Sequence, residues 1–363
     1  MQVALAKIAI DLGLFRTLKE SEAPLSLAQL AEKTGASPKL LGKYAALAIM
    51  GLSKSQQGAF FAHKLHLASS RRLGPRNTLR VHSLMSLPTP MLLVPLHSCM
   101  SHSSTSRHSN EFILRFDISG PCTQLLPDYL AETGYQEIVS NKECPFQKAF
   151  QTSQTLFEWM PQHPKHMKSL GHLMALQRPT VWVDHFPVLE QLGEFPGPDK
   201  TLMVDIGGGF GQQSKALRSK CPSVEGRIIV QDMPQTLASA EPAEGVEFAE
   251  HDFFQPQPVE GAKFYYLRHV LHDWPDEQCV QILQQVIPAM APESRILIDE
   301  VVIPVTGVPW QAAFMDLLMM ESFASIERTR AEWEALMDKA GLKIIEEYHY
   351  DGKEQAILVV IPK

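Results

Sequence analysis

Acidic residues that follow short apolar runs form the first pattern in this chain that could support chemistry. Asp205 ends the run 202–204 and is followed by a turn with glycines at positions 207, 208, 209 and 211. Asp232 ends a second apolar run about 20 residues after this turn, and Asp252 follows a third run. Such runs predict parallel strands, whose carboxyl ends meet at one edge of a sheet where α/β proteins bind ligands. We therefore expect the three acids to line one binding site.

The composition of the glycine turn favours a cationic ligand over a dinucleotide. A dinucleotide turn requires G-x-G-x-x-G, and Gln212 stands where the third glycine belongs. A carboxylate at Asp205 would repel a phosphate but attract a positive charge. S-adenosylmethionine carries a sulfonium and an ammonium and no phosphate, so we favour it as the cofactor. Gly207 and Gly209 would let this ligand lie against the backbone because they lack a Cβ.

The two later acids suit the remaining parts of the same cofactor. Asp232 is at the position, about 20 residues after the glycine turn, where an acid binds the ribose hydroxyls of a nucleotide ligand. NAD enzymes have an acid at the same position. Asp252 could accept a hydrogen bond from the adenine amino group, and the Phe253 ring could pack on the adenine face. Three acids at three successive strand ends make S-adenosylmethionine the more specific prediction.

Composition and charge disfavour several other classes of protein. The 363 residues favour two domains, and the 45% hydrophobic and 20% charged residues are typical of a soluble globular protein. A net charge of −7 without a basic patch argues against a nucleic-acid partner. No apolar span reaches ~18 residues, so we expect no membrane segment. The five cysteines are scattered and lack CxxC spacing, which predicts reduced thiols in a cytoplasmic protein and no metal centre.

The first 50 residues carry helical patterns. Apolar residues at helical spacing predict one helix from Val3 to Leu18. Ser26 is expected to cap a short helix that ends at Gly35, and Ser37-Pro38 to begin another that runs to Leu52. This arrangement predicts a helix-turn-helix of the winged-helix type.

A role in reading DNA is disfavoured for this helix-turn-helix. Its second helix offers Lys39, Lys43 and Tyr44 as contacts, which are too few to neutralise a series of phosphates. We expect the motif to serve packing or dimerisation instead.

Composition divides the chain near residue 120. Residues 84–110 are rich in Ser, His, Pro and Met and show neither helical nor strand periodicity, so we interpret them as an irregular insertion. We expect a mainly α-helical, winged-helix-like dimerisation domain over 1–120 and a cofactor-binding domain over 121–363. A helical lead-in covers 121–195, and prolines and glycines at 195–198 separate it from the first strand.

The remaining strands complete a Rossmann-like α/β fold. A fourth strand is expected to begin at Phe264 with its carboxyl end at His272, and a fifth to cover 295–298 with Asp299-Glu300 at its end. A parallel sheet that ends in an antiparallel hairpin is typical of class I methyltransferases. The segments 342–350 and 356–361 near the C-terminus predict such a hairpin. Asp351-Gly352 is its predicted tight turn.

Five motifs carry a resemblance to a known family. They are VDIGGG at 204–209, QDMP at 231–234, HDFF at 251–254, LHDWPDE at 271–277, and ERT at 327–329 followed by Glu332-Trp333. The chain resembles the plant caffeate-type and fungal secondary-metabolite O-methyltransferases. Its features are more typical of the fungal members. These enzymes join a winged-helix dimerisation domain to a Rossmann-like domain that binds S-adenosylmethionine. The resemblance covers about the first 50 residues and the chain from about residue 125 to its end.

The resemblance implies methyl transfer to a hydroxyl of a small molecule. A phenol with a pKa near 10 is a weak nucleophile at neutral pH, so a base should take its proton as the methyl moves. His272 is the predicted base. The resemblance implies that Glu300 and Glu327 hold its second nitrogen and that Arg268 contacts the cofactor. His269, three residues earlier in the predicted strand, should project to the opposite face and be structural.

Pocket residues for the acceptor are less sharply defined. Trp159 and Met174 lie in the segment that leads into the catalytic domain, and Met319 is taken with them as a lining residue. The family has a Phe-Asn pair before its pocket methionine, whereas Leu170-Gly171 precede Met174 here. We expect an aromatic or polyketide-derived acceptor and a homodimeric enzyme.

Other functions stay open at the level of sequence. Relatives of the same fold bind S-adenosylmethionine but catalyse rearrangement or cyclisation without methyl transfer, and His272 could persist in such an enzyme. An inactive truncated relative and a winged-helix regulator are further alternatives. NAD-dependent oxidoreduction is disfavoured by the missing third glycine and by Asp205.

Overall fold

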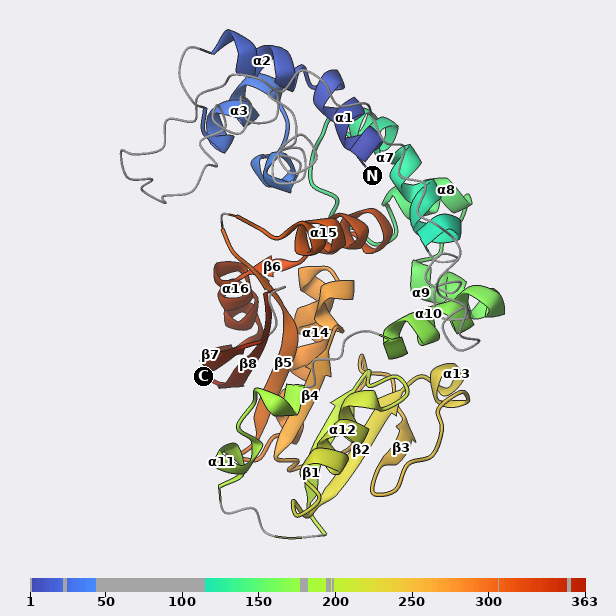
Figure 1. Cartoon of the computed structure of the whole chain (residues 1–363), viewed down its shortest axis with the longest axis vertical. Helices are drawn as coiled ribbons and strands as arrows, with labels where there is room; N and C mark the ends of the chain where they lie inside the picture. The colour runs from blue at the N-terminus through green and yellow to red at the C-terminus, as the bar shows by residue number, and fades with distance from the viewer. Residues whose placement is uncertain are drawn as a thin grey trace, which may run out of the picture.

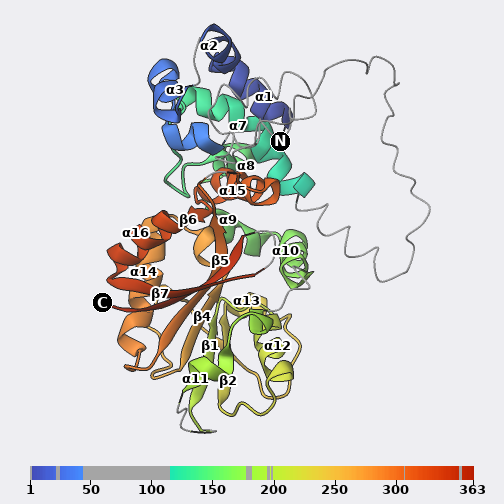
Figure 2. The ribbon, with the colours of Figure 1, turned by 60° about the vertical axis from the view of Figure 1, so that its left-hand side comes forward.

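The computed structural model describes residues 2–21, 25–43, 115–176, 182–193, 197, 199–305, 307–350 and 354–363. A lobe of helices stands beside a lobe built on one sheet, and helix α15 (Trp310–Phe323) lies between them in both views (Figures 1 and 2). In the described part of the chain, no helix is both long enough and apolar enough to cross a membrane.

The sheet has the strand order β3-β2-β1-β4-β5-β8-β7, and a short strand β6 pairs with β5. The first five strands run parallel, while β8 pairs antiparallel with both β5 and β7. This arrangement confirms the predicted Rossmann-like fold with a C-terminal antiparallel hairpin. The strands are β1 Thr201–Ile206, β2 Arg227–Asp232, β3 Glu247–Glu250, β4 Phe264–Arg268, β5 Arg295–Ile303, β6 Arg328–Thr329, β7 Leu342–His349 and β8 Gln355–Pro362.

Helices cover both faces of the sheet, and alternate strand residues therefore enter two cores. Tyr265 and Leu267 of β4 pack with α14 (Asp276–Val286) and α16 (Arg330–Ala340). On the other face, the β4 residues Phe264 and Tyr266 pack with a second group of elements. That group is α12 (Gln212–Lys220), α11 (Val188–Leu192) and the 3-10 turn η3 (Trp182–Asp184).

The helical lobe has its own apolar core, which joins α1 to helices that follow residue 120. Leu5 and Ile8 of α1 share this core with Leu126, Phe146 and residues of α15. The predicted division at 120 therefore runs through one core and remains a proposal. The elements of this lobe are α1 Gln2–Asp11, α2 Leu14–Glu20, α3 Leu27–Thr34, a helical segment 38–43, η1 Arg115–Ser119, α7 Gly120–Glu132, α8 Pro145–Phe150, α9 Leu156–Trp159, η2 Met160–Gln162 and α10 Pro164–Leu176.

The helix boundaries predicted near the N-terminus are confirmed in part. Ser26 accepts a hydrogen bond from the Gln29 N–H and caps α3, and Gly35 ends that helix in a left-handed conformation, as predicted. The single helix predicted from Val3 to Leu18 is wrong, because Gly13 adopts φ 64° and separates α1 from α2. The predicted helix up to Leu52 is described as far as residue 43; the rest of the winged helix and the insertion at 84–110 lie outside the described residues.

Two strands differ from prediction at their carboxyl ends. Strand β4 ends at Arg268, because His269 takes a left-handed φ of 50°, and His272 lies in the following 3-10 turn η4 (Leu271–Asp273). Strand β5 continues to Ile303, so Glu300 lies inside the strand instead of at its end. Both differences move side chains toward one another above the sheet.

The two strands of the hairpin are joined next to the Tyr350 N–H, which donates to the Gln355 carbonyl at 2.8 Å, and Glu354 has a φ of 64°. The predicted tight turn at Asp351-Gly352 lies outside the described residues. Elsewhere, short elements link the strands: α13 (Pro234–Leu237) follows β2, and η5 (Ile287–Ala289) follows α14.

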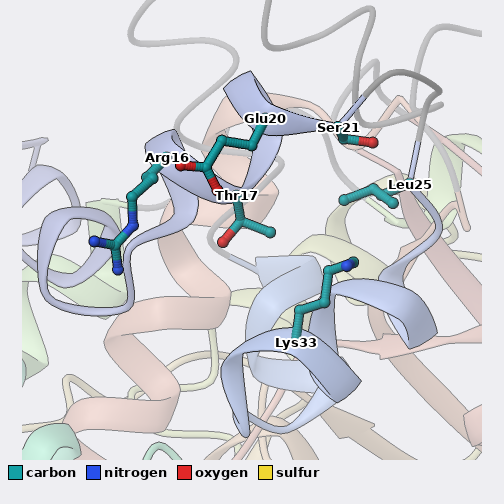
Figure 3. A pocket seen from close by; sticks show the side chains of 6 residues that line it. All are labelled: Arg16, Thr17, Glu20, Ser21, Leu25 and Lys33. Carbon is teal, nitrogen blue, oxygen red and sulfur yellow. The ribbon is translucent and has the colours of Figure 1, made fainter.

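An open hollow of about 650 Å³ lies on the helical lobe, between α2 and α3 (Figure 3). It takes its lining from Arg16, Thr17, Glu20, Ser21, Leu25 and Lys33. These residues belong to other elements than the predicted catalytic and cofactor residues, so we do not assign the chemistry to this hollow.

Candidate active site

The glycine turn brings its backbone into close contact with two neighbouring side chains. A Cβ on Gly208 would stand 2.6–2.9 Å from the Asp205 carboxyl atoms, and one on Gly207 would stand 2.9 Å from Val270. Gly207 and Gly209 both have positive φ, at 66° and 59°. Because Val270 directly precedes η4, the turn that carries His272 packs against the glycine turn.

Two of the predicted cofactor acids bond to the glycine turn or to the helix α12 that follows it. Asp205 is buried and accepts a hydrogen bond from Ser214 Oγ at 2.6 Å, and burial raises the pKa of its carboxyl to about 7. Asp232 accepts from the Gly209 N–H at 2.8 Å and from the Met233 N–H at 2.7 Å. We call residues 205–214 together with Asp232 the cofactor edge.

Aromatic rings stand beside this edge. Phe253 contacts Trp274 edge-to-face, with ring centroids 5.9 Å apart, and Phe157 of α9 stacks on Trp274 at 5.4 Å. Asp252 is exposed, and its Oδ1 accepts from the Phe254 N–H at 3.0 Å. Trp274 was not among the predicted site residues, although its place directly after His272-Asp273 was a usable signal.

The residues predicted to do the chemistry converge around His272. Its Nδ1 lies 2.9 Å from Glu327 Oε1, and the side chains of both residues are buried. Glu300 Oε1 accepts the N–H groups of Val270 and Leu271, at 3.0 and 2.9 Å, and also that of His272 at 3.3 Å. The other oxygen, Oε2, lies 3.9 Å from His272 Nδ1. We call His272, Glu300 and Glu327 the catalytic cluster.

The charges of the catalytic cluster and its burial shift the pKa of His272 in opposite directions. Burial by itself lowers the pKa of His272, but Glu300, Glu327 and Asp273 raise it to about 10. Burial raises the pKa of Glu300 to about 7 and that of Asp273 to about 6. The site therefore favours one or more protons shared between the imidazole and the carboxylates.

The prediction that His269 projects to the opposite face of the sheet is wrong. Its left-handed backbone turns the ring toward His272, with centroids 4.9 Å apart, and its Nδ1 lies 3.7 Å from Glu300 Oε2. Donor atoms of His269, His272 and Glu300 lie within 4.8 Å of one another, a spacing that a metal ion could use. Glu327 engages His272 Nδ1, so Nε2 is the ring nitrogen left for a further partner.

Arg268 belongs to a buried polar network. Its Nη1 donates to Asp299 Oδ2 at 2.7 Å and to the Tyr350 hydroxyl at 2.8 Å. The hydroxyls of Tyr266 and Tyr350 each donate to Asp299 at 2.5 Å, and Gln355 donates at 2.7 Å. A contact between Arg268 and the cofactor therefore stays a prediction.

The predicted acceptor residues are dispersed. Trp159 is buried in the core of the helical lobe and stacks on His163, with centroids 3.4 Å apart. Met319 is buried on α15, a helix that contacts η4. Met174 lies in α10, but its side chain is outside the part of the chain that the structure describes. None of these described contacts joins Trp159 to the catalytic cluster.

The strand order with its reversed hairpin is that of a class I methyltransferase, and the comparisons with known proteins agree. Residues 128–343, more than half of the chain, match the family model described as an O-methyltransferase domain. The chain therefore belongs to the O-methyltransferase family.

Several individual relatives have a high sequence identity to this chain. Demethylsterigmatocystin 6-O-methyltransferase of Aspergillus flavus is 61% identical over 363 residues, which cover 100% of this chain and 86% of that protein. Demethylsterigmatocystin 6-O-methyltransferase stcP of Emericella nidulans is 96% identical over 204 residues, which cover 56% of this chain and 100% of that protein.

Solved structures of similar fold include the complex of LepI with S-adenosylmethionine. It is 32% identical, with a TM-score of 0.69, and the match covers 100% of this chain and 86% of that one. A structure titled as a pericyclic reaction enzyme matches with the same values. On these findings the protein is an S-adenosylmethionine-dependent O-methyltransferase that acts on a hydroxyl of a secondary metabolite.

Proposed function

We propose that the acceptor is a polyketide-derived phenol of the kind that demethylsterigmatocystin represents. The support is that relatives with 61% and 96% identity carry this molecule in their names. A phenolic hydroxyl also matches the site, because it must lose a proton to become a good nucleophile and the catalytic cluster offers a base.

The observation that carries the mechanism is the buried contact between His272 Nδ1 and Glu327 Oε1 at 2.9 Å. A proton on Nδ1 donates to Glu327, so Nε2 is the ring atom that takes the proton from the acceptor hydroxyl. When bound, S-adenosylmethionine supplies a methyl group that passes from its sulfonium to the acceptor oxygen. The imidazolium left on His272 is then stabilised by Glu327 and Glu300.

Glu300 has a second part in this mechanism. Its Oε1 accepts the consecutive backbone N–H groups that begin the η4 turn, so it fixes the backbone that carries His272. Its Oε2 is buried, has no hydrogen-bond partner among the residues that the structure describes, and lies 3.9 Å from His272 Nδ1. Glu300 thus both positions the base and holds a negative charge beside it.

The cofactor edge has the chemistry that S-adenosylmethionine requires. The turn from Asp205 to Ser214 contains no lysine or arginine, and its glycines keep the backbone accessible. We propose that Gly207 and Gly209 contact the cofactor and that Asp232 binds its ribose. Asp205 would supply negative charge, while Asp252, Phe253 and Arg268 are proposed as further contacts.

A second candidate function is rearrangement or cyclisation with bound S-adenosylmethionine and no methyl transfer. The similarity to a structure titled as a pericyclic reaction enzyme favours it. Methyl transfer explains the His272–Glu327 pair better, because a pericyclic step needs no base at the acceptor oxygen.

The acceptor pocket and the assembly of the protein are also proposals. Trp159, Met174 and Met319 are proposed to line the pocket. We propose a homodimer, which light scattering would report as twice the 40.6 kDa of one chain, and a monomer in that measurement would contradict it. A cytoplasmic location, proposed from the scattered cysteines, would be contradicted if cell fractionation recovered the protein with membranes.

The test combines binding and turnover. We expect micromolar binding of S-adenosylmethionine in a calorimetric titration, no binding of NAD, and loss of binding in Asp232→Ala. With demethylsterigmatocystin as acceptor, His272→Ala should lose about 10²- to 10⁴-fold in kcat and keep its affinity for the cofactor.

Three outcomes would contradict this function. A folded protein that does not bind S-adenosylmethionine is not the enzyme proposed here. A His272→Ala variant with wild-type kcat would remove the base from the mechanism. Conversion of the acceptor to an isomer of unchanged mass would favour the second candidate function.

A further inference from the structure

A buried ion pair joins the helical segment 38–43 to α15, the helix between the two lobes, close to the catalytic cluster. Lys43, in the helical segment 38–43, donates from Nζ to Asp316 Oδ1 of α15 at 2.6 Å. The two side chains are 9% and 6% exposed, so water screens the pair poorly. Removing one partner of such a pair leaves the other as a buried unpaired charge.

The same oxygen of Asp316 also holds the backbone of a catalytic residue. Asp316 Oδ1 accepts the Glu327 N–H at 2.9 Å, and Glu327 Oε1 lies 2.9 Å from His272 Nδ1. An unbroken series of polar contacts therefore runs from Lys43 through Asp316 and Glu327 to His272. Its members come from the helical segment 38–43, α15, the segment after α15 and η4.

This series matters because Glu327 does not lie in a regular element that would aim its side chain. It stands between the end of α15 at Phe323 and strand β6, which begins at Arg328. The hydrogen bond from its N–H to Asp316 is therefore one of the contacts that fix its direction. Burial raises the pKa of Asp316, and the Lys43 cation opposes this shift, so Lys43 helps to keep the Asp316 carboxylate charged.

The same helical segment offers an internal comparison. Lys39, one turn before Lys43, pairs with Glu332 of α16 at 2.8 Å. Those side chains are 38% and 33% exposed, and Glu332 caps α16 through Thr329. Lys39 thus ties the helical segment to α16 and Lys43 ties it to α15, and of these two pairs only the Lys43 pair contacts Glu327 through Asp316.

We propose that Lys43 is a positioning residue for methyl transfer, which acts through Asp316 to orient Glu327 and hence His272. In this way the helical lobe controls the geometry of the base in the other lobe. The proposal rests on the proposed role of His272 as the base.

The test compares Lys43→Met with Lys39→Met in the full-length protein, with S-adenosylmethionine and demethylsterigmatocystin. We expect Lys43→Met to lose on the order of tenfold in kcat, because a misplacement of about 1 Å caused by a remote change can cost about 10²-fold and a partial one costs less. Its KM for the acceptor and its Kd for the cofactor should change less than about threefold. Lys39→Met should resemble the wild type in all three quantities, and Lys43→Arg should restore most of kcat.

A spectroscopic signature separates positioning from a general loss of structure. In protein labelled with ¹⁵N-histidine, the proton shared between His272 Nδ1 and Glu327 should give a downfield resonance that is absent in His272→Ala. We expect it to move upfield in Lys43→Met and to stay in place in Lys39→Met. Glu300, Asp273 and His269 also face His272, and none of them is altered by these variants.

Each result bears on the proposal. Wild-type kcat and an unmoved resonance in Lys43→Met would overturn it, and so would equal losses in both lysine variants. If Lys43→Met does not fold, Lys43→Gln, which keeps a hydrogen-bond donor, is measured against Lys39→Gln with the same criteria. A His272→Ala variant with wild-type kcat refutes the base itself, whereas an enzyme that needs His272 but not Lys43 refutes this proposal alone.

Discussion

The cofactor edge and the catalytic cluster are built from the same sheet but held together in different ways. The cofactor edge is a strand, a turn and the start of a helix, and its hydrogen bonds involve backbone groups or near neighbours such as Asp205 and Ser214. The catalytic cluster takes its three side chains from a 3-10 turn, a strand and the segment after α15. Its contacts span 28 to 55 residues.

This difference determines which kinds of change should disturb each of the two sites. Steric fit governs the cofactor edge, because a Cβ on Gly208 would meet the Asp205 carboxylate. Electrostatics govern the catalytic cluster, because several carboxylates surround one buried imidazole. The cluster should therefore respond strongly to pH and charge, and the cofactor edge to side-chain volume.

The largest expected effect is the pH dependence of kcat/KM with demethylsterigmatocystin. The neighbouring carboxylates raise the pKa of His272 to about 10, so the neutral base forms as the pH rises toward that value. We expect kcat/KM to increase about tenfold per pH unit between about 7 and 9, since one ionisation is involved. Cofactor affinity should rise severalfold at most over this range, as Asp205 completes its ionisation.

Glu327→Gln checks the cause of this pH dependence. Loss of one carboxylate should lower the pKa of His272 and move the rising limb of the profile to lower pH, while the plateau of kcat falls about 10- to 100-fold. Glu334→Gln, on the exposed side of α16, is the matched control and should change neither quantity. A profile that is flat above pH 7 in the wild type would show that His272 is not the titrating base.

A smaller effect is expected from adding one methyl group at the cofactor edge. Gly208→Ala would place a Cβ within 2.6–2.9 Å of the Asp205 carboxyl, and overpacking of this kind costs about 1–3 kcal/mol. We expect affinity for S-adenosylmethionine to fall on the order of tenfold in calorimetry. Gly42→Ala, whose Cβ would meet Leu27 at an ordinary 3.5 Å, should bind as the wild type does. Equal affinity in both variants would contradict a steric control of this edge.

Much of the fold could be predicted because its signals are local. The glycine turn, the acids at or near the ends of β1 and β2 (Asp205 and Asp232) and the cap at Ser26 involve residues that are close in the chain, so spacing and residue type suffice. The errors involve single backbone conformations. Left-handed residues at Gly13 and His269 break a helix and a strand that periodicity alone would continue.

The residues of the catalytic cluster and their contact with His272 were predicted from the motifs and the resemblance, but the distances and the burial were not. Sequence indicated His272 with two glutamates, but burial and the distances between them decide how protons are shared. Arg268 illustrates the same limit, because the resemblance implied a cofactor contact and the guanidinium pairs with Asp299, 31 residues away.

The sequence by itself determined the succession of strands along the chain, the C-terminal hairpin, the character of the cofactor and the residue types of the base and its carboxylates. These depend on local periodicity and on chemistry that each side chain carries wherever it lies. The tertiary structure decided which charges meet, such as Lys43 with Asp316 across 273 residues. Pairing of this kind depends on how the two lobes pack and on how far water is excluded, and neither is encoded in the spacing of residues along the chain.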